Sequence, residues 1–300
     1  MKKKTYLIAL MAMALTLGSC SDNENGIGGE TSKYITVSTS IGNMTRVATD
    51  EKGGQTFEEG DEISVYAWTG DATVAPETRE RVVNNAINKL TNGSWVSTPQ
   101  MLWKNNREKH YFIGVYPTAA ISDLSAGEYT FDETKQVESD LLVAVNKDGL
   151  SYNADEQQTV PLTFTHVMAK LAVNLTYKNQ WGGIPTVEKV VVGNAAKEAT
   201  INYLTKVVTP STTAKEDFSL PEITENTKYV SVIIPQEEVT QLTIVIGGKN
   251  FVYDNGTPFK LESGKITTVN LEVGRDEIKL GDVKITNWED GSTFSGEALN

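Results

Sequence analysis

Apolar and polar residues alternate with a period of two over many short stretches of this chain. The first such stretch places Ile35, Val37, Thr39 and Ile41 on one side, and comparable runs recur as far as residue 285. A period of two is typical of a β-strand with one buried face. Asn-Gly, Asp-Gly and Gly-Gly pairs, which accept positive φ in tight hairpins, separate several of the runs. The pattern predicts an all-β protein made of β-sandwiches with short strands.

Two places depart from simple alternation. At His166 the alternation changes phase by one residue, which predicts either a β-bulge or a crossing between two sheets. Between residues 77 and 90 several apolar residues are spaced three or four apart. This spacing predicts the one helix of the chain, although the asparagines of the stretch are poor helix formers.

The N-terminal segment has the pattern of a bacterial lipoprotein signal. Lysines at positions 2–4 precede an apolar stretch of 12 residues, 6–17, which is too short to span a bilayer because a helical span needs about 20. Small residues then lead to Cys20, the single cysteine of the chain. We expect residues 1–19 to be a signal peptide, Cys20 to be lipidated and residues 20–32 to be a disordered acidic tether. The alternative is an ordinary secretory signal with a chance cysteine.

Composition narrows the classes of function. The chain carries 27 Lys+Arg against 39 Asp+Glu, a net charge of −12, and such an acidic protein repels nucleic acid. With Cys20 lipidated, no thiol remains for a disulfide, a zinc site or a nucleophile. The only imidazoles are His110 and His166, and the sequence contains no nucleophile elbow, paired-histidine metal motif or phosphate loop. We therefore predict a protein that is not an enzyme and binds no cofactor or metal.

Several pieces of sequence, taken in order, resemble the fimbrillin-like (type V) pilins of Bacteroidales, which are fimbrial subunits made as lipoprotein precursors. After Cys20 comes a first strand that ends in Met44-Thr45-Arg46. The other pieces are FEEGDEISVY (57–66), LTFTHVMAKL (162–171), LESGKITTVNL (261–271) and ITNWEDG (285–291). The resemblance runs nearly end to end. It implies two transthyretin-like β-sandwich domains in tandem, residues 33–170 and 171–300.

The resemblance also implies a route of maturation. In this family the exported lipoprotein is cut by an arginine-specific protease, which removes the first strand with its lipid, and the groove left behind accepts a strand from another subunit. The cleavage site maps onto Arg46, so that residues 33–46 form the removable strand and Val47 begins the mature subunit. The lipidated precursor is expected at the outer membrane and the mature protein in a fimbrium at the cell surface. Its expected partners are other fimbrial subunits and the protease.

Residues 278–300 are the predicted donor strand. The chain passes from an apparent last core strand through a polar hinge into a segment whose apolar residues would fill a neighbour's groove: Ile278, Leu280, Val283 and Ile285. The equal alternative is that this segment completes its own domain.

The resulting functional prediction is a structural subunit of a cell-surface fimbria that supports adhesion. The alternative is a monomeric surface lipoprotein that binds glycan or host protein through a β-sandwich. For that alternative, Trp95 and Trp103 are the candidate sugar-stacking residues, while burial of both indoles is the default expectation.

Overall fold

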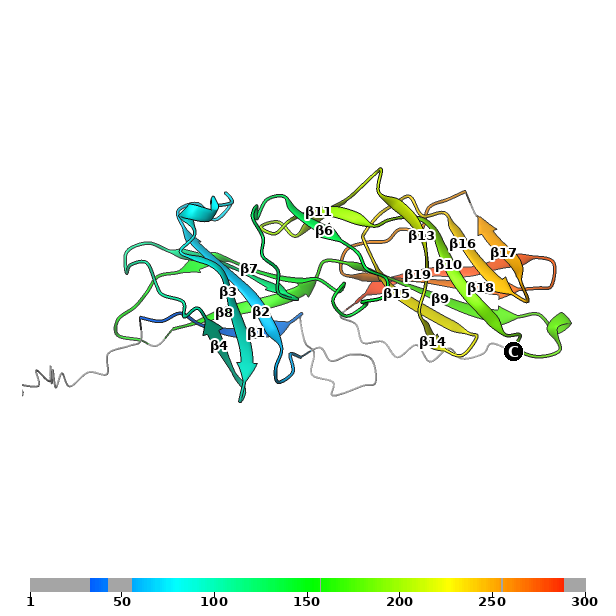
Figure 1. Cartoon of the computed structure of the whole chain (residues 1–300), viewed down its shortest axis with the longest axis horizontal. Helices are drawn as coiled ribbons and strands as arrows, with labels where there is room; N and C mark the ends of the chain where they lie inside the picture. Colours follow the sequence, from blue (N-terminus) through cyan, green and yellow to red (C-terminus); the bar gives the residue numbers. More distant parts are fainter. Residues whose placement is uncertain (1–32, 43–55, 157, 255, 289–300) are drawn as a thin grey trace, which may run out of the picture. The chain divides into compact units, whose positions relative to one another are not determined.

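The protein is described here from a computed structural model, which describes residues 33–42, 56–156, 158–254 and 256–288 (Figure 1). All of them lie in one compact unit, Thr31–Asn300. They form 19 β-strands and two short 3-10 helices, Thr78–Glu80 and Asn179–Trp181, and these described ranges contain no α-helix. The prediction of an all-β protein is confirmed. Within the same ranges, no helix is long and apolar enough to cross a bilayer.

The largest sheet has seven strands. In spatial order they are β1 (Thr36–Ile41), β8 (Thr159–His166), β7 (Leu142–Leu150), β5 (His110–Tyr116), β2 (Glu62–Thr69), β3 (Val83–Thr91) and β4 (Ser94–Thr98). All neighbours in this sheet are antiparallel except β1 and β8, which are parallel. β1 and β4 are its two edge strands.

Three smaller sheets contain the remaining strands. The five-stranded sheet has the order β14 (Glu222–Thr224), β15 (Lys228–Ile233), β9 (Ala169–Tyr177), β18 (Lys265–Val273) and β19 (Ile278–Asn287). The four-stranded sheet has the order β13 (Lys215–Ser219), β10 (Val187–Ala196), β16 (Gln241–Ile246) and β17 (Lys249–Asp254). The three-stranded sheet has the order β12 (Val207–Pro210), β11 (Glu198–Asn202) and β6 (Gly127–Thr130).

Two of the predicted tight turns are confirmed, whereas the Asp148-Gly149 pair lies within β7 and joins no two strands. Asn92 and Gly93, with φ of 51° and 73°, join β3 to β4, and Gly247 and Gly248, with φ of 59° and 72°, join β16 to β17. Two consecutive residues with positive φ give the hairpin turn whose twist matches that of the flanking strands.

The phase change at His166 is a crossing between sheets. β8 ends at His166 in the seven-stranded sheet, and β9 starts at Ala169 in the five-stranded sheet. Strands from the two sides of this point occupy different sheets, except that β6 pairs with β11. One large hydrophobic cluster also takes side chains from both sides of the crossing. The division into domains 33–170 and 171–300 stays a prediction.

The predicted helix over residues 77–90 is wrong. The stretch contains one 3-10 turn, Thr78–Glu80, followed by strand β3. The register of β2 and β3 shifts beside Asn85, which has a φ of 56°. This bulge places the buried residues Val83 and Ala86 three positions apart on a strand, a spacing that imitates a helix.

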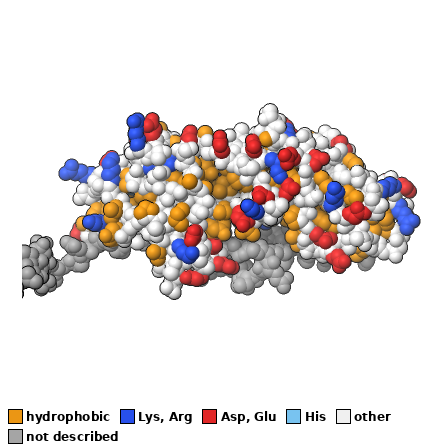
Figure 2. Space-filling model, viewed as in Figure 1, with side chains coloured by type: hydrophobic (Ala, Val, Ile, Leu, Met, Phe, Trp, Pro, Cys, Tyr) orange, Lys and Arg blue, Asp and Glu red, His pale blue; other side chains and the backbone are white. Residues whose placement is uncertain are grey.

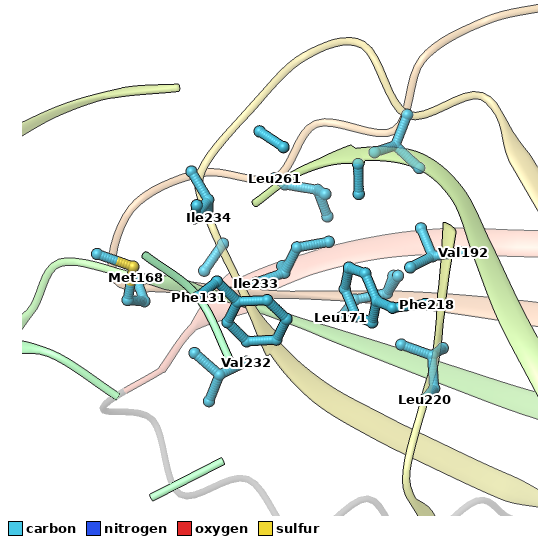
Figure 3. Close-up of a cluster of buried hydrophobic side chains, with 14 of the residues drawn as sticks. Phe131, Met168, Leu171, Val192, Phe218, Leu220, Val232, Ile233, Ile234 and Leu261 are labelled. Carbon is cyan, nitrogen blue, oxygen red and sulfur yellow. The ribbon is translucent and has the colours of Figure 1, made fainter. Parts of the chain in front are cut away.

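Two hydrophobic clusters form the core. The smaller one lies against the seven-stranded sheet and includes Ile63, Val65 and Phe112 together with residues of β1. The larger one lies chiefly among the other sheets, and Figure 3 shows part of it, with the rings of Phe131 and Phe218 5.0 Å apart. β2 contributes to both clusters, because its alternate side chains are buried on both faces of the sheet.

Candidate strand-exchange site

β1 is held along its length by one strand. Residues Thr36 to Ile41 run parallel to β8, opposite Thr159 to Phe164. At its start the N–H of Ile35 donates to the carbonyl oxygen of Met101 (3.0 Å), and just beyond its end the N–H of Gly42 donates to the carbonyl oxygen of Phe164 (2.8 Å). These are main-chain contacts that another extended segment is able to reproduce, because they do not depend on side-chain identity.

The side chains of β1 divide between two faces. Ile35, Val37 and Ile41 are 2%, 6% and 9% exposed and cover the smaller hydrophobic cluster, whereas Ser38 and Ser40 face solvent. The alternation predicted for this strand is confirmed. Removing β1 would uncover apolar side chains that lie beside its own on the same face of the sheet, including Val160, Leu162 and Phe164 of β8.

A groove of about 700 Å³ lies beside β1, between this strand and the end of the β3–β4 hairpin. The two edge strands of the sheet, β1 and β4, contact one another here (Figure 1). The indole N–H of Trp95 in β4 donates to the hydroxyl of Thr39 in β1 (3.0 Å). Phe57 packs edge-on against Trp95 and Phe164, with ring centroids 5.3 and 5.1 Å apart. β1 therefore lies in a channel with β8 on one side and aromatic side chains on the other.

The predicted donor segment forms β19, which pairs antiparallel with β18 at the edge of the five-stranded sheet. The register shifts at Gly281, so that this residue has no partner on β18. Because of the bulge, all four predicted residues oppose buried β18 positions 267–273 and share their face: Ile278, Leu280, Val283 and Ile285.

Burial along β19 is incomplete. Ile278 and Leu280 are half-buried against the larger cluster, but Val283 and Ile285 are 41% and 36% exposed. In this chain alone the segment therefore completes its own sheet, with part of its apolar face uncovered. Whether it is donated to a second subunit stays a prediction.

The other predicted site residues, Cys20, Arg46 and Val47, lie outside the described residues. Gly42 is the last described residue before Arg46 in the sequence. Phe57 belongs to the FEEGDEISVY stretch that carries the family resemblance, but its role as a wall of the groove beside β1 was not predicted. Its aromatic side chain was the available signal, and its partners come from distant parts of the sequence.

Trp95 and Trp103, the candidates for sugar stacking, both contact other residues of the protein. Trp103 is 8% exposed and packs edge-on against His110 and Phe112. Trp95 is half-buried and hydrogen-bonded to β1. Trp103 is therefore too buried to stack on a sugar, whereas Trp95 lines the groove beside β1.

His110 has a structural role, because main-chain groups occupy both of its ring nitrogens. The Nε2 atom accepts the main-chain N–H of Lys104 (3.0 Å), and Nδ1 lies 3.2 Å from the carbonyl oxygen of Glu108. The ring is therefore neutral with its hydrogen on Nδ1, and burial lowers the pKa of His110. Among the described residues, no three His, Cys, Asp or Glu side chains are grouped to hold a metal ion. Acidic and basic side chains are interspersed on the described surface drawn in Figure 2.

Comparison with known proteins identifies relatives along nearly the whole chain. A family model described as fimbrillin-like matches residues 45–288. The protein named "Putative fimbrium subunit Fim1C" from Bacteroides uniformis is 24% identical over 315 residues, which cover 97% of this chain and 97% of that protein.

Solved structures share the fold. A "putative cell adhesion protein" from Bacteroides uniformis superposes with a TM-score of 0.60 at 19% identity, covering 86% of this chain and 100% of that one. A second, from Bacteroides ovatus, gives 0.62 at 18% identity and covers 85% of this chain and 98% of that one. A fimbrial protein from Bacteroides vulgatus gives 0.51 at 12% identity, with coverage of 84% and 99%.

Proposed function

This chain belongs to the fimbrillin-like family, and we propose that it is a structural subunit of a fimbria at the cell surface, where it supports adhesion. The family is one of structural, non-enzymatic proteins. In the proposed pathway the precursor is exported with a lipid on Cys20 and anchored in the outer membrane. An arginine-specific protease then cuts after Arg46, and other fimbrial subunits assemble with the product by strand exchange.

The observation that carries the proposal is the construction of β1. It is an edge strand with main-chain contacts to β8 and a buried apolar face, and it precedes Arg46 in the sequence. Fully burying a Val or Ile side chain contributes about 1.5–3 kcal/mol. Loss of Ile35, Val37 and Ile41 would therefore leave an apolar groove and an unpaired β8 edge, and an incoming strand of matching alternation would restore both contributions.

A gel and an N-terminal analysis discriminate between the fimbrial proposal and a monomeric surface lipoprotein. We expect the surface form to begin at Val47 and to run as a ladder of polymers when the sample is not boiled. A lipidated monomer that begins at Cys20 would overturn the proposal. The glycan-binding alternative gains little support from its two candidate indoles, since Trp103 is buried and Trp95 donates a hydrogen bond to β1.

The anchor is tested at Cys20. A Cys20→Ala precursor is expected to lose metabolic fatty-acid labelling and to fail to reach the outer surface, because lipidation and signal-peptide removal both require the thiol. Ser21→Ala is the matched control and should be labelled and displayed normally. Normal surface display of the Cys20→Ala protein would contradict the lipoprotein assignment.

A further inference from the structure

Trp288, the residue that follows β19, is enclosed by groups from β8, from β9 and from the turn before β18. Its indole stacks on the imidazole of His166, with ring centroids 4.1 Å apart and planes 8° apart. The ammonium nitrogen of Lys170 lies 4.2 Å from the centroid of the indole. The main-chain N–H of Trp288 donates to the carbonyl oxygen of Gly264 (3.0 Å). Stacking and cation–π contacts of this kind favour an indole over other side chains.

The carboxylate of Asp140 orients the imidazole ring that stacks on Trp288. Oδ1 of Asp140 lies 2.8 Å from Nδ1 of His166, and both side chains are largely buried. This contact fixes the hydrogen on Nδ1 and the orientation of the ring that stacks on Trp288. Burial lowers the pKa of Lys170, while the charge of Asp140 opposes that shift and favours the ammonium form.

Trp288 is better buried than any residue of β19, the strand that it follows. It is 7% exposed, whereas every residue of β19 is half-buried or exposed. β19 is also an edge strand with one main-chain neighbour, β18. An edge strand with weak side-chain burial opens easily, so a single well-enclosed side chain at its end has a large influence on whether it stays in place.

We propose that His166, Lys170 and Asp140 form an indole-binding site that holds the C-terminal strand in its own sheet until Trp288 is withdrawn. The proposal names the retaining device of the donor strand and in that respect rests on the proposed function. The ligand of the site is the indole of Trp288 from the same chain.

β8 connects this site to the removable strand. His166 is the last residue of β8, and β8 is the strand that pairs with β1. The N–H of Gly42, at the end of β1, donates to the carbonyl oxygen of Phe164, two residues before His166. Removal of β1 leaves β8 as an edge strand and breaks this hydrogen bond. His166 keeps its pairing with Leu142 of β7, so we expect cleavage to weaken the indole site through β8 without dismantling it.

The test uses the uncleaved precursor and free indole as the probe. In a Trp288→Ala variant, hydrogen exchange over residues 278–287 is expected to rise by roughly ten- to a hundredfold. Indole is expected to raise the melting temperature of this variant, because it refills the site, and to leave the fast exchange of β19 unchanged, because it does not tether the strand. In a double variant with Trp288→Ala and His166→Ala, indole should no longer raise the melting temperature. Trp103→Ala, a truncation of an equally buried indole in the smaller hydrophobic cluster, is the control in which β19 exchange stays slow.

Unchanged exchange of β19 in Trp288→Ala would overturn the proposal, and so would an absence of indole binding. If Trp288→Ala does not fold, the His166→Leu precursor serves, with the same rise in exchange expected and unchanged exchange again contradicting the site. The fimbrial proposal fails separately. If the protein shows every expected effect of indole but forms no polymer after cleavage, the indole site is supported and the fimbrial function is contradicted.

Discussion

Replacing Arg46 with alanine is expected to leave the protein monomeric after treatment with an arginine-specific protease. Wild-type precursor under the same treatment should give one main product that begins at Val47 and then polymerises. The physical reason is that β1 blocks its own groove until the chain is cut, since its pairing with β8 is intramolecular and outcompetes a strand from a second molecule. The expected effect of Arg46→Ala is large, because the protease-treated variant should be entirely monomeric where wild type is polymeric.

The other arginines provide the controls for this cut. Arg81 is 9% exposed, and its guanidinium donates to the carbonyl oxygens of Ile121 and Ser122, so it should resist the protease. Arg107 is exposed, and an Arg107→Ala precursor should be cut and polymerise like wild type. Mass spectrometry of the product reads the new N-terminus. A dominant cut at Arg79, Arg81 or Arg107 with Arg46 intact would count against the assignment.

Deleting residues 276–300 is expected to abolish polymerisation while leaving a folded protein. The deletion removes β19 and Trp288, but β18 keeps its parallel pairing with β9. Loss of one buried indole costs about 3 kcal/mol or more. This loss should lower the melting temperature by roughly 5–10 °C for a chain of this size. After cleavage at Arg46 the truncated subunit should lose β1 normally and remain unable to donate a strand.

A shorter deletion is the matched control. Removing residues 289–300 keeps β19, Trp288 and the four apolar residues of the donor segment, and it should preserve both melting temperature and polymerisation. Calorimetry and unboiled gels measure the two properties. Polymerisation of the 276–300 deletion would contradict strand donation, and failure of that deletion to fold would show that β19 belongs to the core of its own sheet.

Strands and tight turns were predictable because their signals are local. The alternation of β1 and the Asn92-Gly93 hairpin each depend on a few consecutive residues, and the structure confirms both. The helix prediction over residues 77–90 failed at Asn85, where one bulged residue converts a period of two into an apparent helical spacing. Periodicity alone does not distinguish these cases.

The contacts of the candidate site were not predictable because they join distant parts of the chain. Trp288 is conspicuous in the sequence, yet nothing near it indicates that His166 and Lys170 enclose its indole. The bulge at Gly281 likewise brings all four apolar residues of β19 onto one face although their spacing breaks the alternation. Both features depend on the tertiary fold, which fixes which strands become neighbours.

We propose that a strand from a second copy takes the place of β1, and disulfide formation in the cleaved polymer tests this replacement. Val160→Cys places a thiol on β8 beside the position of Val37 in β1, and separate partners carry a cysteine at one of four donor positions: Ile278, Leu280, Val283 and Ile285. Cys20, the single native cysteine, lies before Arg46 and would leave with the segment removed by the proposed cleavage, so that no other thiol would interfere. We expect a disulfide between copies, formed only after cleavage, at the donor position that faces Val160. A polymer that forms without any such disulfide, or a disulfide confined within one chain, would contradict it.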